Sequence, residues 1–429
     1  MPSTPPTLHP THGPVGARVQ PLAQQNGGNA LLTPPTTPEK QTDRKPPAQD
    51  ATAKVDGLEA EIAEGLSLSN PNEEYKINVP EMPQQPREYT KKYQILNELG
   101  HGIWSVVYSA TEALEPQAPS AATKLPPTPP VSPSTTSQVS LEQQKPKEIL
   151  AIKSPSRRDA HKHLQKEARI LTYLSKFPAF NNHIVPFHGF DVLQNSLVLS
   201  AIPMTLDTYI KSATTNTPFS TKMMFTPIIG AQTWATMTNS LLSGLAFLHT
   251  HRCIHGDIKP ANILLQNTTD TQGAEQLVPL YCDFSSSHIL PPSSSPLDPE
   301  IEEVTAVTAD YTAPELLAAL HARGSGPTRA VATFASDVFG LAVTLLFAAT
   351  GESPYSSGRI DLQRVGMARE GRPVEFARSG EQGSRIPSEG VVDRVLRGGV
   401  EGVGKRLQVG EWGQEVGEIL QGWSEGEEV

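Results

Sequence analysis

Four polar residues in the middle of the chain could carry out phosphoryl transfer. Asp257, Lys259 and Asn262 stand close together between apolar flanks, and Asp283 follows further on. A carboxylate can orient a substrate hydroxyl and accept its proton, and an amine can stabilise charge on the moving phosphoryl group. An amide and a second carboxylate can hold Mg²⁺. The spacing therefore predicts Asp257, Lys259 and Asn262 as catalytic residues, with Asn262 and Asp283 as metal ligands.

A glycine-containing turn upstream could position a nucleotide. The alternating stretch Tyr93–Leu99 leads into Gly100 and Gly102, and an apolar stretch with Val107 follows. This pattern is typical of strand, tight turn and strand. The two glycines let backbone amides approach phosphates closely, and Val107 would lie over the purine. We therefore expect these residues to contribute to nucleotide binding.

Several motifs in a fixed order resemble those of the eukaryotic protein kinases. His255-Gly256-Asp257, followed by Asn262, is similar to the catalytic loop of that family, and Asp283-Phe284-Ser285 is similar to its DFG motif. Ala313-Pro314-Glu315 looks like the APE motif. Lys259, two residues after the aspartate, is the form found in the serine/threonine type. The resemblance implies an α+β, bilobal fold with a small, mostly β N-lobe and a larger, mostly α C-lobe.

The same resemblance implies further nucleotide-binding residues. Lys153 ends the apolar strand Ile149–Lys153 and matches the lysine that holds the α and β phosphates, with Glu167 as its ion-pair partner. Leu199 matches the residue that limits the back of the adenine pocket, and Ala201 lies in the hinge. ATP and Mg²⁺ are the implied cofactors.

The sequence departs from the family pattern at several positions, and two of them lie next to proposed site residues. Gly256 replaces the arginine that reads a phosphate on the activation segment, so we do not expect switching through that arginine. Ser285 replaces the glycine of DFG and reduces backbone freedom there, without removing a metal ligand. Asp337, in a motif that begins a helix, is expected to cap the backbone of the catalytic loop.

Residues 285–312 fit an activation segment. It is rich in serine and proline, and Thr308 near its end is expected to bridge the catalytic aspartate and lysine. Its acidic residues form one cluster: Asp298, Glu300, Glu302 and Glu303.

Beyond Pro354 the resemblance fades, and apolar residues are sparse. Arg394 and Arg406 are both candidates for the arginine that pairs with the glutamate of APE, and neither lies in a recognisable motif. We therefore expect the last quarter of the large lobe to be weakly built.

The composition favours one bilobal domain with disordered additions rather than several domains. The chain has 429 residues, of which 40 are proline and 37% are hydrophobic. The predicted regions are a disordered Pro/Thr-rich region at 1–86, a kinase domain at 87–424 with a Pro/Ser/Thr-rich insertion at 114–147, and an acidic tail at 425–429. Within the first region, Val55–Leu66 has the apolar spacing of a short helix.

Charge and cysteine content limit the partners and the compartment. The net charge of −10 gives no basic footprint for nucleic acid, and no apolar run is long enough to span a membrane. Cys253 and Cys282 are the only cysteines, too few for a disulfide framework. We expect a cytoplasmic or nuclear protein that acts on protein substrates and possesses Pro-rich tails open to partner binding.

Three functions remain open at this stage. The first is an ATP-dependent serine/threonine protein kinase that transfers the γ-phosphate to protein hydroxyls. The second is a pseudokinase or scaffold that keeps the fold and acts through partner binding. It is suggested by Gly256, by Ser285, by the missing glycine before Thr308 and by the C-terminal part, where the resemblance fades. The third is a small-molecule kinase of similar fold, although such relatives usually lack the APE segment present here.

Overall fold

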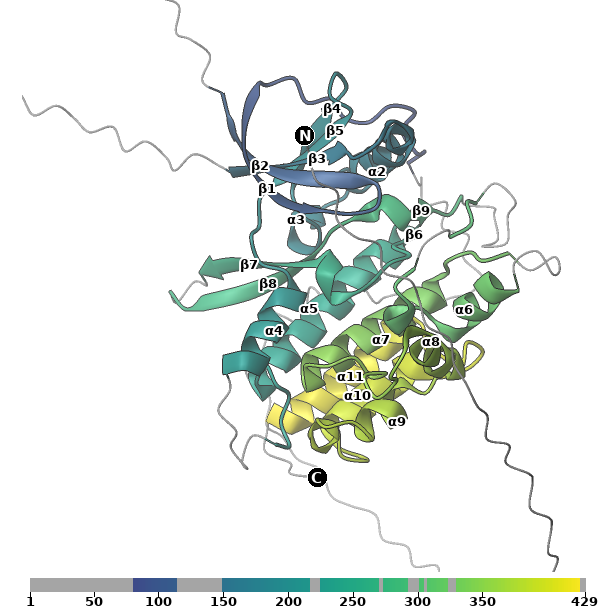
Figure 1. Ribbon diagram of the computed structural model, residues 1–429. Helices are drawn as coiled ribbons and strands as arrows, with labels where there is room; N and C mark the ends of the chain where they lie inside the picture. Colours follow the sequence, from purple (N-terminus) through teal and green to yellow (C-terminus); the bar gives the residue numbers. More distant parts are fainter. Residues whose placement is uncertain are drawn as a thin grey trace, which may run out of the picture. The chain divides into compact units, whose positions relative to one another are not determined.

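The computed structural model describes most of the chain beyond residue 79 (Figure 1). The described ranges are 80–113, 149–216, 224–269, 273–291, 301–304, 307–322 and 329–424. Most of the predicted Pro/Thr-rich region, with its helical pattern at Val55–Leu66, lies outside them, as do the insertion at 114–147 and the acidic tail at 425–429. All described residues belong to one unit, Ser69–Val429.

Among the described residues, five antiparallel strands form the sheet of a small lobe, in the order β1-β2-β3-β5-β4. The strands are β1 (Tyr93–His101), β2 (Ser105–Glu112), β3 (Ile149–Pro155), β4 (Phe187–Asp191) and β5 (Ser196–Ser200). Side chains alternate between the two faces of a strand. In β3, Leu150 and Ile152 pack in one apolar cluster, and Ala151 packs in another. Lys153 shares the face of Ala151, which is the face toward the main core.

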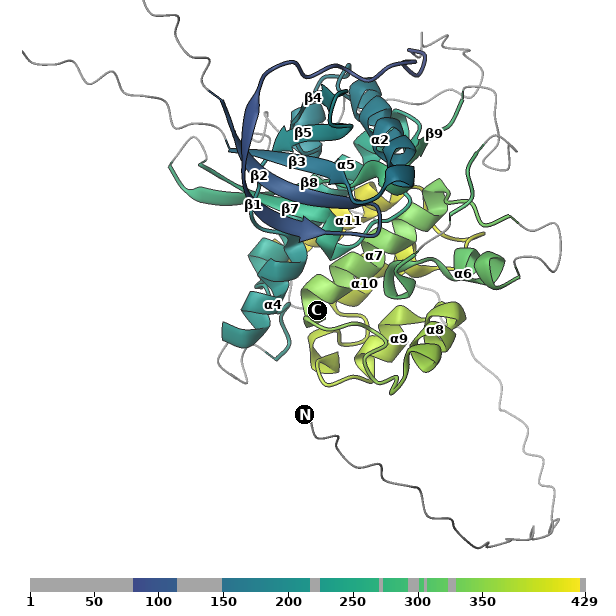
Figure 2. The same cartoon turned by 45° about the horizontal axis from the view of Figure 1, so that its top comes forward.

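Helix α2 (His161–Leu174) covers that face of the sheet (Figure 2). Leu164, Ala168 and Leu171 recur at the spacing of one helical face and are buried. Glu167 lies within the same stripe, three residues after Leu164, and is 1% exposed. The apolar packing of α2 therefore carries an acidic side chain into the interior, facing β3.

Residues 80–92 lie along α2 and the edge of the sheet. The carbonyl of Pro83 accepts a hydrogen bond of 2.8 Å from Arg169 Nε of α2. The backbone N–H of Phe190 in β4 donates to the Arg87 carbonyl at 2.7 Å. This segment therefore extends the small lobe before β1. The Pro/Thr-rich region predicted at the N-terminus overlaps its first part, and the predicted domain boundaries stay predictions.

The large lobe is mostly helical. Its helices are α3 (Phe180–His183), α4 (Leu206–Asn216), α5 (Ala231–Thr250), α6 (Pro314–His321), α7 (Phe334–Thr350), α8 (Asp361–Glu370), α9 (Pro373–Arg378), α10 (Val391–Val400) and α11 (Val409–Ser424). Its short strands are β6 (Cys253–Ile254), β7 (Ile263–Thr269), β8 (Glu275–Tyr281) and β9 (His288–Ile289). Strand β6 pairs with β9, and β7 pairs with β8.

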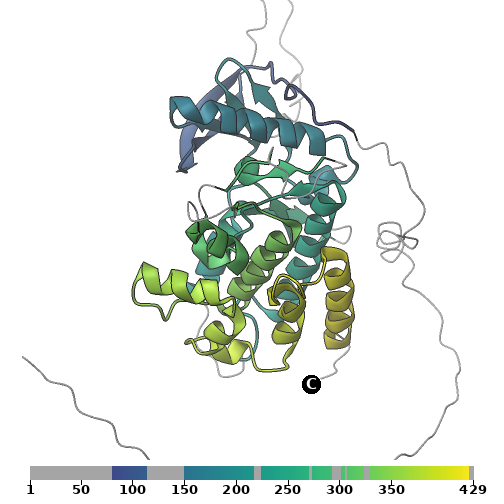
Figure 3. The same cartoon turned by 90° about the vertical axis from the view of Figure 1, so that its right-hand side faces the viewer.

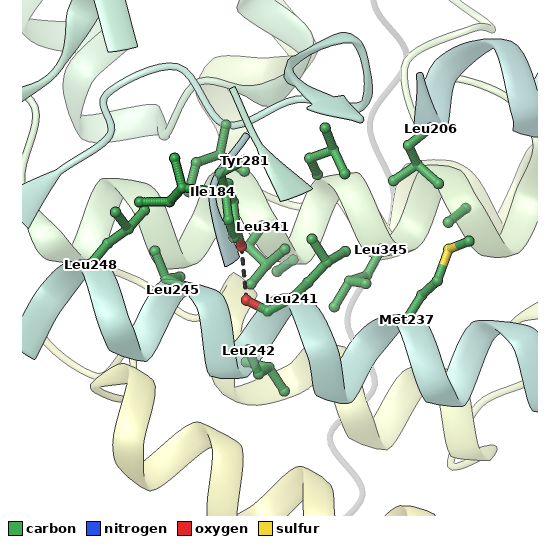
Figure 4. Packing of buried hydrophobic residues seen from close by; sticks show 14 of the residues in the cluster. Ile184, Leu206, Met237, Leu241, Leu242, Leu245, Leu248, Tyr281, Leu341 and Leu345 are labelled. Atoms are coloured by element: carbon green, nitrogen blue, oxygen red, sulfur yellow. Dashed lines mark hydrogen bonds between the residues drawn. The ribbon is translucent and has the colours of Figure 1, made fainter. Parts of the chain in front are cut away.

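Helices α5 and α7 form the centre of this lobe. Figure 4 shows leucines of both helices packed together, with the Tyr281 hydroxyl donating to the Leu241 carbonyl at 2.8 Å. Trp234 of α5 is fully buried, and its indole N–H donates to the Leu345 carbonyl at 3.0 Å. Burying each such side chain contributes about 1.5–3 kcal/mol. The predicted bilobal α+β fold is confirmed.

The end of the large lobe is better packed than the sequence indicates. Helices α10 and α11 lie against α7 and α5 (Figure 3). Trp412 is fully buried and donates to the Val395 carbonyl at 2.8 Å. A Cβ atom at Gly399 would lie 2.7 Å from Ala342 Cβ, so the glycine permits a close approach of α10 to α7. The expectation of a weakly built lobe is therefore wrong, because glycine and one tryptophan provide packing that a count of apolar residues misses.

Candidate active site

A buried ion pair joins β3 to α2. Lys153 Nζ donates to Glu167 Oε1 at 2.8 Å and to Oε2 at 2.7 Å. The two side chains are 9% and 1% exposed. The structure thus brings together the two residues that the resemblance pairs, one from the centre of the sheet and one from the buried stripe of the helix.

Asp283 completes this cluster from the large lobe. Its Oδ1 accepts a hydrogen bond of 2.7 Å from Lys153 Nζ. The backbone of Asp283 is left-handed, with φ of 63°, and places Phe284 in the core. The N–H of Phe284 donates to Glu167 Oε1 at 3.1 Å. One lysine and one glutamate therefore link the small lobe, α2 and the start of the activation segment.

The protonation states of this cluster follow from its charges. Burial alone would raise the pKa of Asp283, but the Lys153 ammonium and its hydrogen bond hold that pKa well below its usual range. Burial alone would lower the pKa of Lys153, but the two carboxylates outweigh it and raise that pKa. Asp283 is thus a carboxylate and Lys153 an ammonium at neutral pH.

The predicted catalytic residues form a second cluster. Asp257 Oδ2 accepts hydrogen bonds from Lys259 Nζ at 2.7 Å and from Asn262 Nδ2 at 3.0 Å. Asn262 Nδ2 also donates to the Asp257 carbonyl at 2.8 Å. The Asn262 amide nitrogen is thereby engaged with the loop itself, which leaves its side-chain oxygen as the atom suited to a metal.

Two further residues hold the catalytic loop in place. Asp337, at the start of α7, accepts hydrogen bonds from the backbone N–H of His255 at 2.7 Å and of Gly256 at 2.9 Å. Lys259 Nζ donates to Thr308 Oγ1 at 3.0 Å. The structure therefore places Asp337 as a backbone cap, and Thr308 against the lysine that binds Asp257.

The other predicted nucleotide-binding residues lie in β1, in the turn that follows it, in β2, in β5 and directly after β5. Gly102 N–H closes the turn by donating to the Ser105 carbonyl at 2.7 Å, and a Cβ atom at Gly100 would meet nothing within 4 Å. Val107 pairs with Lys153 across β2 and β3.

At the other end of the site, Leu199 pairs with Ala151 across β3 and β5. The N–H of Ala201 donates to the Ile149 carbonyl at 2.9 Å, so this donor is engaged within the small lobe.

A cleft of about 550 Å³ joins the two clusters. Gly102 lines it from the small lobe, and Asp257, Asp283 and Thr308 line it from the large lobe. Such a volume falls in the range of small-molecule sites. The side-chain oxygens of Asp283 and Asn262 are hard donors of the kind that Mg²⁺ prefers, so the residues present fit that ion.

The structure shows which of the two candidate arginines pairs with the glutamate of the APE motif. Arg406 donates to both carboxylate oxygens of Glu315, at 2.6 and 3.2 Å. No described contact joins Arg394 to Glu315. Trp104 and Lys166 also line the cleft, and the sequence motifs did not predict a role for either residue. For Lys166 a signal existed, since it directly precedes Glu167 and the activation segment carries an acidic cluster.

The comparisons with known proteins agree with this geometry. A family model described as the protein kinase domain matches residues 134–385, more than half of the chain. The chain therefore belongs to the eukaryotic protein kinase superfamily. Protein kinase domains in general use ATP and Mg²⁺.

Individual relatives match shorter segments. The MAP kinase kinase kinase wis4 of Schizosaccharomyces pombe is 34% identical over 122 residues, covering 27% of this chain and 8% of the relative. Mitogen-activated protein kinase kinase kinase 5 of Arabidopsis thaliana is 30% identical over 144 residues, covering 34% and 18%. Serine/threonine-protein kinase ISR1 of Saccharomyces cerevisiae is 28% identical over 209 residues, covering 44% and 42%. The chain thus matches less than half of the length of each of these relatives.

None of the helices in the described ranges combines the length and the apolar character needed to cross a membrane.

Proposed function

We propose that the chain is an ATP-dependent serine/threonine protein kinase that transfers the γ-phosphate to protein hydroxyls. The observation that carries this proposal is the position of Lys153 Nζ, which lies within 2.8 Å of Glu167 and within 2.7 Å of Asp283. An active kinase must bring the strand lysine, the helix glutamate and the DFG aspartate together at once. A chain that had lost catalysis would have no need of all three.

Asp257 is the proposed base that orients and accepts the proton of the substrate hydroxyl. It lines the cleft, and its carboxylate is held by Lys259 and Asn262. Lys259 is then placed to stabilise charge on the transferred group. Because both partners are fixed before substrate arrives, little reorganisation is needed during the reaction.

The remaining residues would bind the nucleotide and its metal. Lys153 is proposed to hold the α and β phosphates, with Gly100 and Gly102 covering them through backbone N–H groups. Asn262 and Asp283 would hold Mg²⁺, which neutralises phosphate charge when bound.

At the far end of the site, Val107 and Leu199 would enclose the adenine. Ala201 would contribute the carbonyl of its backbone, since its N–H is already bonded.

Specificity for serine and threonine is supported by two features. The contact between Lys259 and Thr308 joins the catalytic loop to the activation segment in the arrangement that the serine/threonine type implies. Among the relatives, ISR1 of Saccharomyces cerevisiae carries the name serine/threonine-protein kinase. Protein substrates are proposed over small molecules because the chain has the Ala313-Pro314-Glu315 segment, with Glu315 anchored by Arg406.

Gly256 does not argue for loss of activity. Its φ is +79°, and a Cβ atom there would lie 2.7 Å from the Ser286 carbonyl oxygen. The absent arginine is therefore accounted for by a close backbone contact between the catalytic loop and the activation segment. This observation gives the glycine a structural reason that does not require loss of activity.

We further propose that the protein works in a reducing compartment, the cytoplasm or the nucleus. Its two cysteines, Cys253 and Cys282, are both free thiols, and Cys253 is buried. Protein substrates are the proposed partners, together with proteins that bind its Pro-rich tails.

Transfer of labelled phosphate from ATP to generic protein substrates tests the proposal. The wild-type chain should transfer phosphate in the presence of Mg²⁺, and Asp257→Asn should abolish transfer while still binding Mg-ATP in a thermal-shift assay. Asp361→Asn, an exposed aspartate on α8, is the matched control and should behave as wild type. A folded wild-type protein that binds Mg-ATP without transfer would favour the scaffold alternative.

A further inference from the structure

Helix α2 carries three polar side chains on one face, and each meets a different part of the site. His163, Lys166 and Glu167 stand at positions i, i+3 and i+4, which are neighbours on a helix surface. Glu167 binds Lys153, while the other two contact the Gly-rich turn and the activation segment. Figure 2 shows α2 lying across the sheet near β9. The position of this helix therefore depends on more than the Lys153 pair.

The first contact holds the tip of the Gly-rich turn. The ring of Trp104 lies 4.2 Å from that of His163, centroid to centroid, at an interplanar angle of 32°. The guanidinium of Arg157 lies 4.0 Å from the centre of the Trp104 ring, where a cation is attracted to the aromatic face. The Trp104 carbonyl also accepts a hydrogen bond of 3.0 Å from Ser156 N–H. The turn is thus held against the start of α2.

The second contact comes from the activation segment. Lys166 Nζ donates to Glu302 Oε2 at 2.7 Å. The neighbours of Glu302 are anchored to the large lobe, since Ile301 and Val304 are 6% and 8% exposed and pack in an apolar cluster. Val304 N–H also donates to the Ala330 carbonyl at 2.8 Å. The acid is therefore presented to α2 from a fixed part of the large lobe.

Glu302 carries a negative charge without any modification of the chain. In many kinases a phosphate supplies negative charge to this segment and orders it by pairing with nearby cations. Here Gly256 stands where the arginine for such a phosphate would be, and its contact with the Ser286 carbonyl leaves no room for a side chain. A carboxylate that already binds Lys166 provides charge of the same sign.

We propose that Trp104 and Glu302 are positioning residues that hold α2 where Glu167 can bind Lys153, so that the site assembles without a phosphate on the activation segment. This inference rests on the proposed kinase function. Neither residue is among the proposed catalytic, nucleotide-binding or metal-binding residues, and both act through α2. Glu302 exposes 68% of its side chain, and exposed ion pairs are individually weak. The expected effect of breaking this one is therefore graded, about two- to fivefold in kcat.

A double-mutant cycle on the dephosphorylated full chain tests the Glu302 contact. Lys166→Gln and Glu302→Gln should each lower kcat about two- to fivefold. The double variant should be no less active than the less active single variant, because both changes remove the same interaction. The exchanged pair, Lys166→Glu with Glu302→Lys, should recover most of the lost activity. Lys162→Gln, exposed on the same helix, is the matched control and should keep wild-type activity.

The Trp104 contact is tested by two substitutions at one position. Trp104→Ala should raise the KM for ATP and lower kcat, because the Gly-rich turn loses its ring contact with His163 of α2. Trp104→Phe keeps a ring between His163 and Arg157 and should recover most of the activity. Equal melting temperatures of the two variants would separate this effect from a general loss of stability.

Two kinds of result would overturn the inference alone. One is a wild-type protein that loses transfer on phosphatase treatment and regains it on phosphorylation. The other is a cycle with additive effects, or a Lys166→Gln variant as active as Lys162→Gln. Absence of transfer from every form, including untreated wild type, would instead overturn the proposed function, and this inference with it.

Discussion

Arg406 and Glu315 form a two-bonded ion pair across 91 positions of the sequence, with N–O distances of 2.6 and 3.2 Å. The Arg406 side chain is fully buried, and Glu315 is 29% exposed. The same guanidinium donates to the Ala335 carbonyl at 2.8 Å and lies over the Phe339 ring at 5.0 Å. This arginine therefore fastens the APE segment to the start of α7 and to the end of α10.

Removing this arginine should destabilise the large lobe strongly. Arg406→Leu leaves the Glu315 carboxylate without its partner, and breaking a buried ion pair typically costs about 3–5 kcal/mol. Urea unfolding monitored by tryptophan fluorescence measures the change. Arg394→Leu is the matched control on α10 and should cost about 1 kcal/mol or less. Equal losses for the two variants would mean that the pair adds nothing to stability.

The two arginines show where prediction from the sequence ends. Asp257, Lys259 and Asn262 are partners within one loop, so their spacing alone indicates their contacts. The partner of Glu315 lies far along the chain and depends on how α10 packs against α7. Spacing cannot supply that packing, and both Arg394 and Arg406 fitted equally well.

The same limit applies to the activation segment and the last helices. The acidic cluster was visible in the sequence, but only the fold brings Glu302 to Lys166. The burial of Trp412 depends on Gly399, whose missing side chain carries no apolar signal. Motifs thus predicted the fold class, which the structure confirms, and the candidate site residues, which stay predictions, while contacts between distant elements required the structure.

Replacing the buried lysine should impair both stability and activity. Lys153→Met leaves Glu167 and Asp283 close together without a counter-charge, at a cost of about 3–5 kcal/mol. Transfer should fall by at least about a hundredfold, because Lys153 is the residue proposed to position the phosphates. Thermal unfolding and phosphate transfer measure the two effects.

An exposed pair supplies the control for that substitution. Lys91 binds Glu112 at 2.6 Å, with the two side chains 66% and 47% exposed. Lys91→Met should cost less than about 1 kcal/mol and leave transfer unchanged. A Lys153→Met protein as stable and as active as this control would contradict the assigned role of the Lys153 cluster.

Introducing the arginine of the family pattern at position 256 should destabilise the protein. Gly256→Arg forces a side chain into a left-handed backbone and against the Ser286 carbonyl oxygen. Strain of this kind costs about 1–3 kcal/mol before the clash is counted. Gly256→Ala carries the same strain and clash without the charge, so it should lose similar stability in urea unfolding. An arginine variant of wild-type stability and higher activity would contradict this account of the glycine.

His288 should make stability depend on pH. This residue is 9% exposed, and its Nε2 has no hydrogen-bond partner among the described residues. Burial lowers the pKa of His288 to about 4, with Asp337 opposing and Lys166 adding to this shift. The unfolded chain, with an ordinary pKa of about 6.5, therefore binds more protons between these two values. The free energy of unfolding should fall as the pH falls from about 6.5 to about 4, by at most about 3 kcal/mol, with no further loss from this group below that pH.

The comparison of variants isolates this histidine from the carboxylates that titrate in the same range. His288→Gln removes the titrating group, so its urea unfolding free energy should depend less on pH between 4 and 6.5 than that of the wild type. His101, whose side chain is 76% exposed, supplies the matched control. His101→Gln should keep the wild-type slope. A His288→Gln protein with the wild-type slope would show that this buried imidazole contributes nothing to the acid sensitivity of the fold.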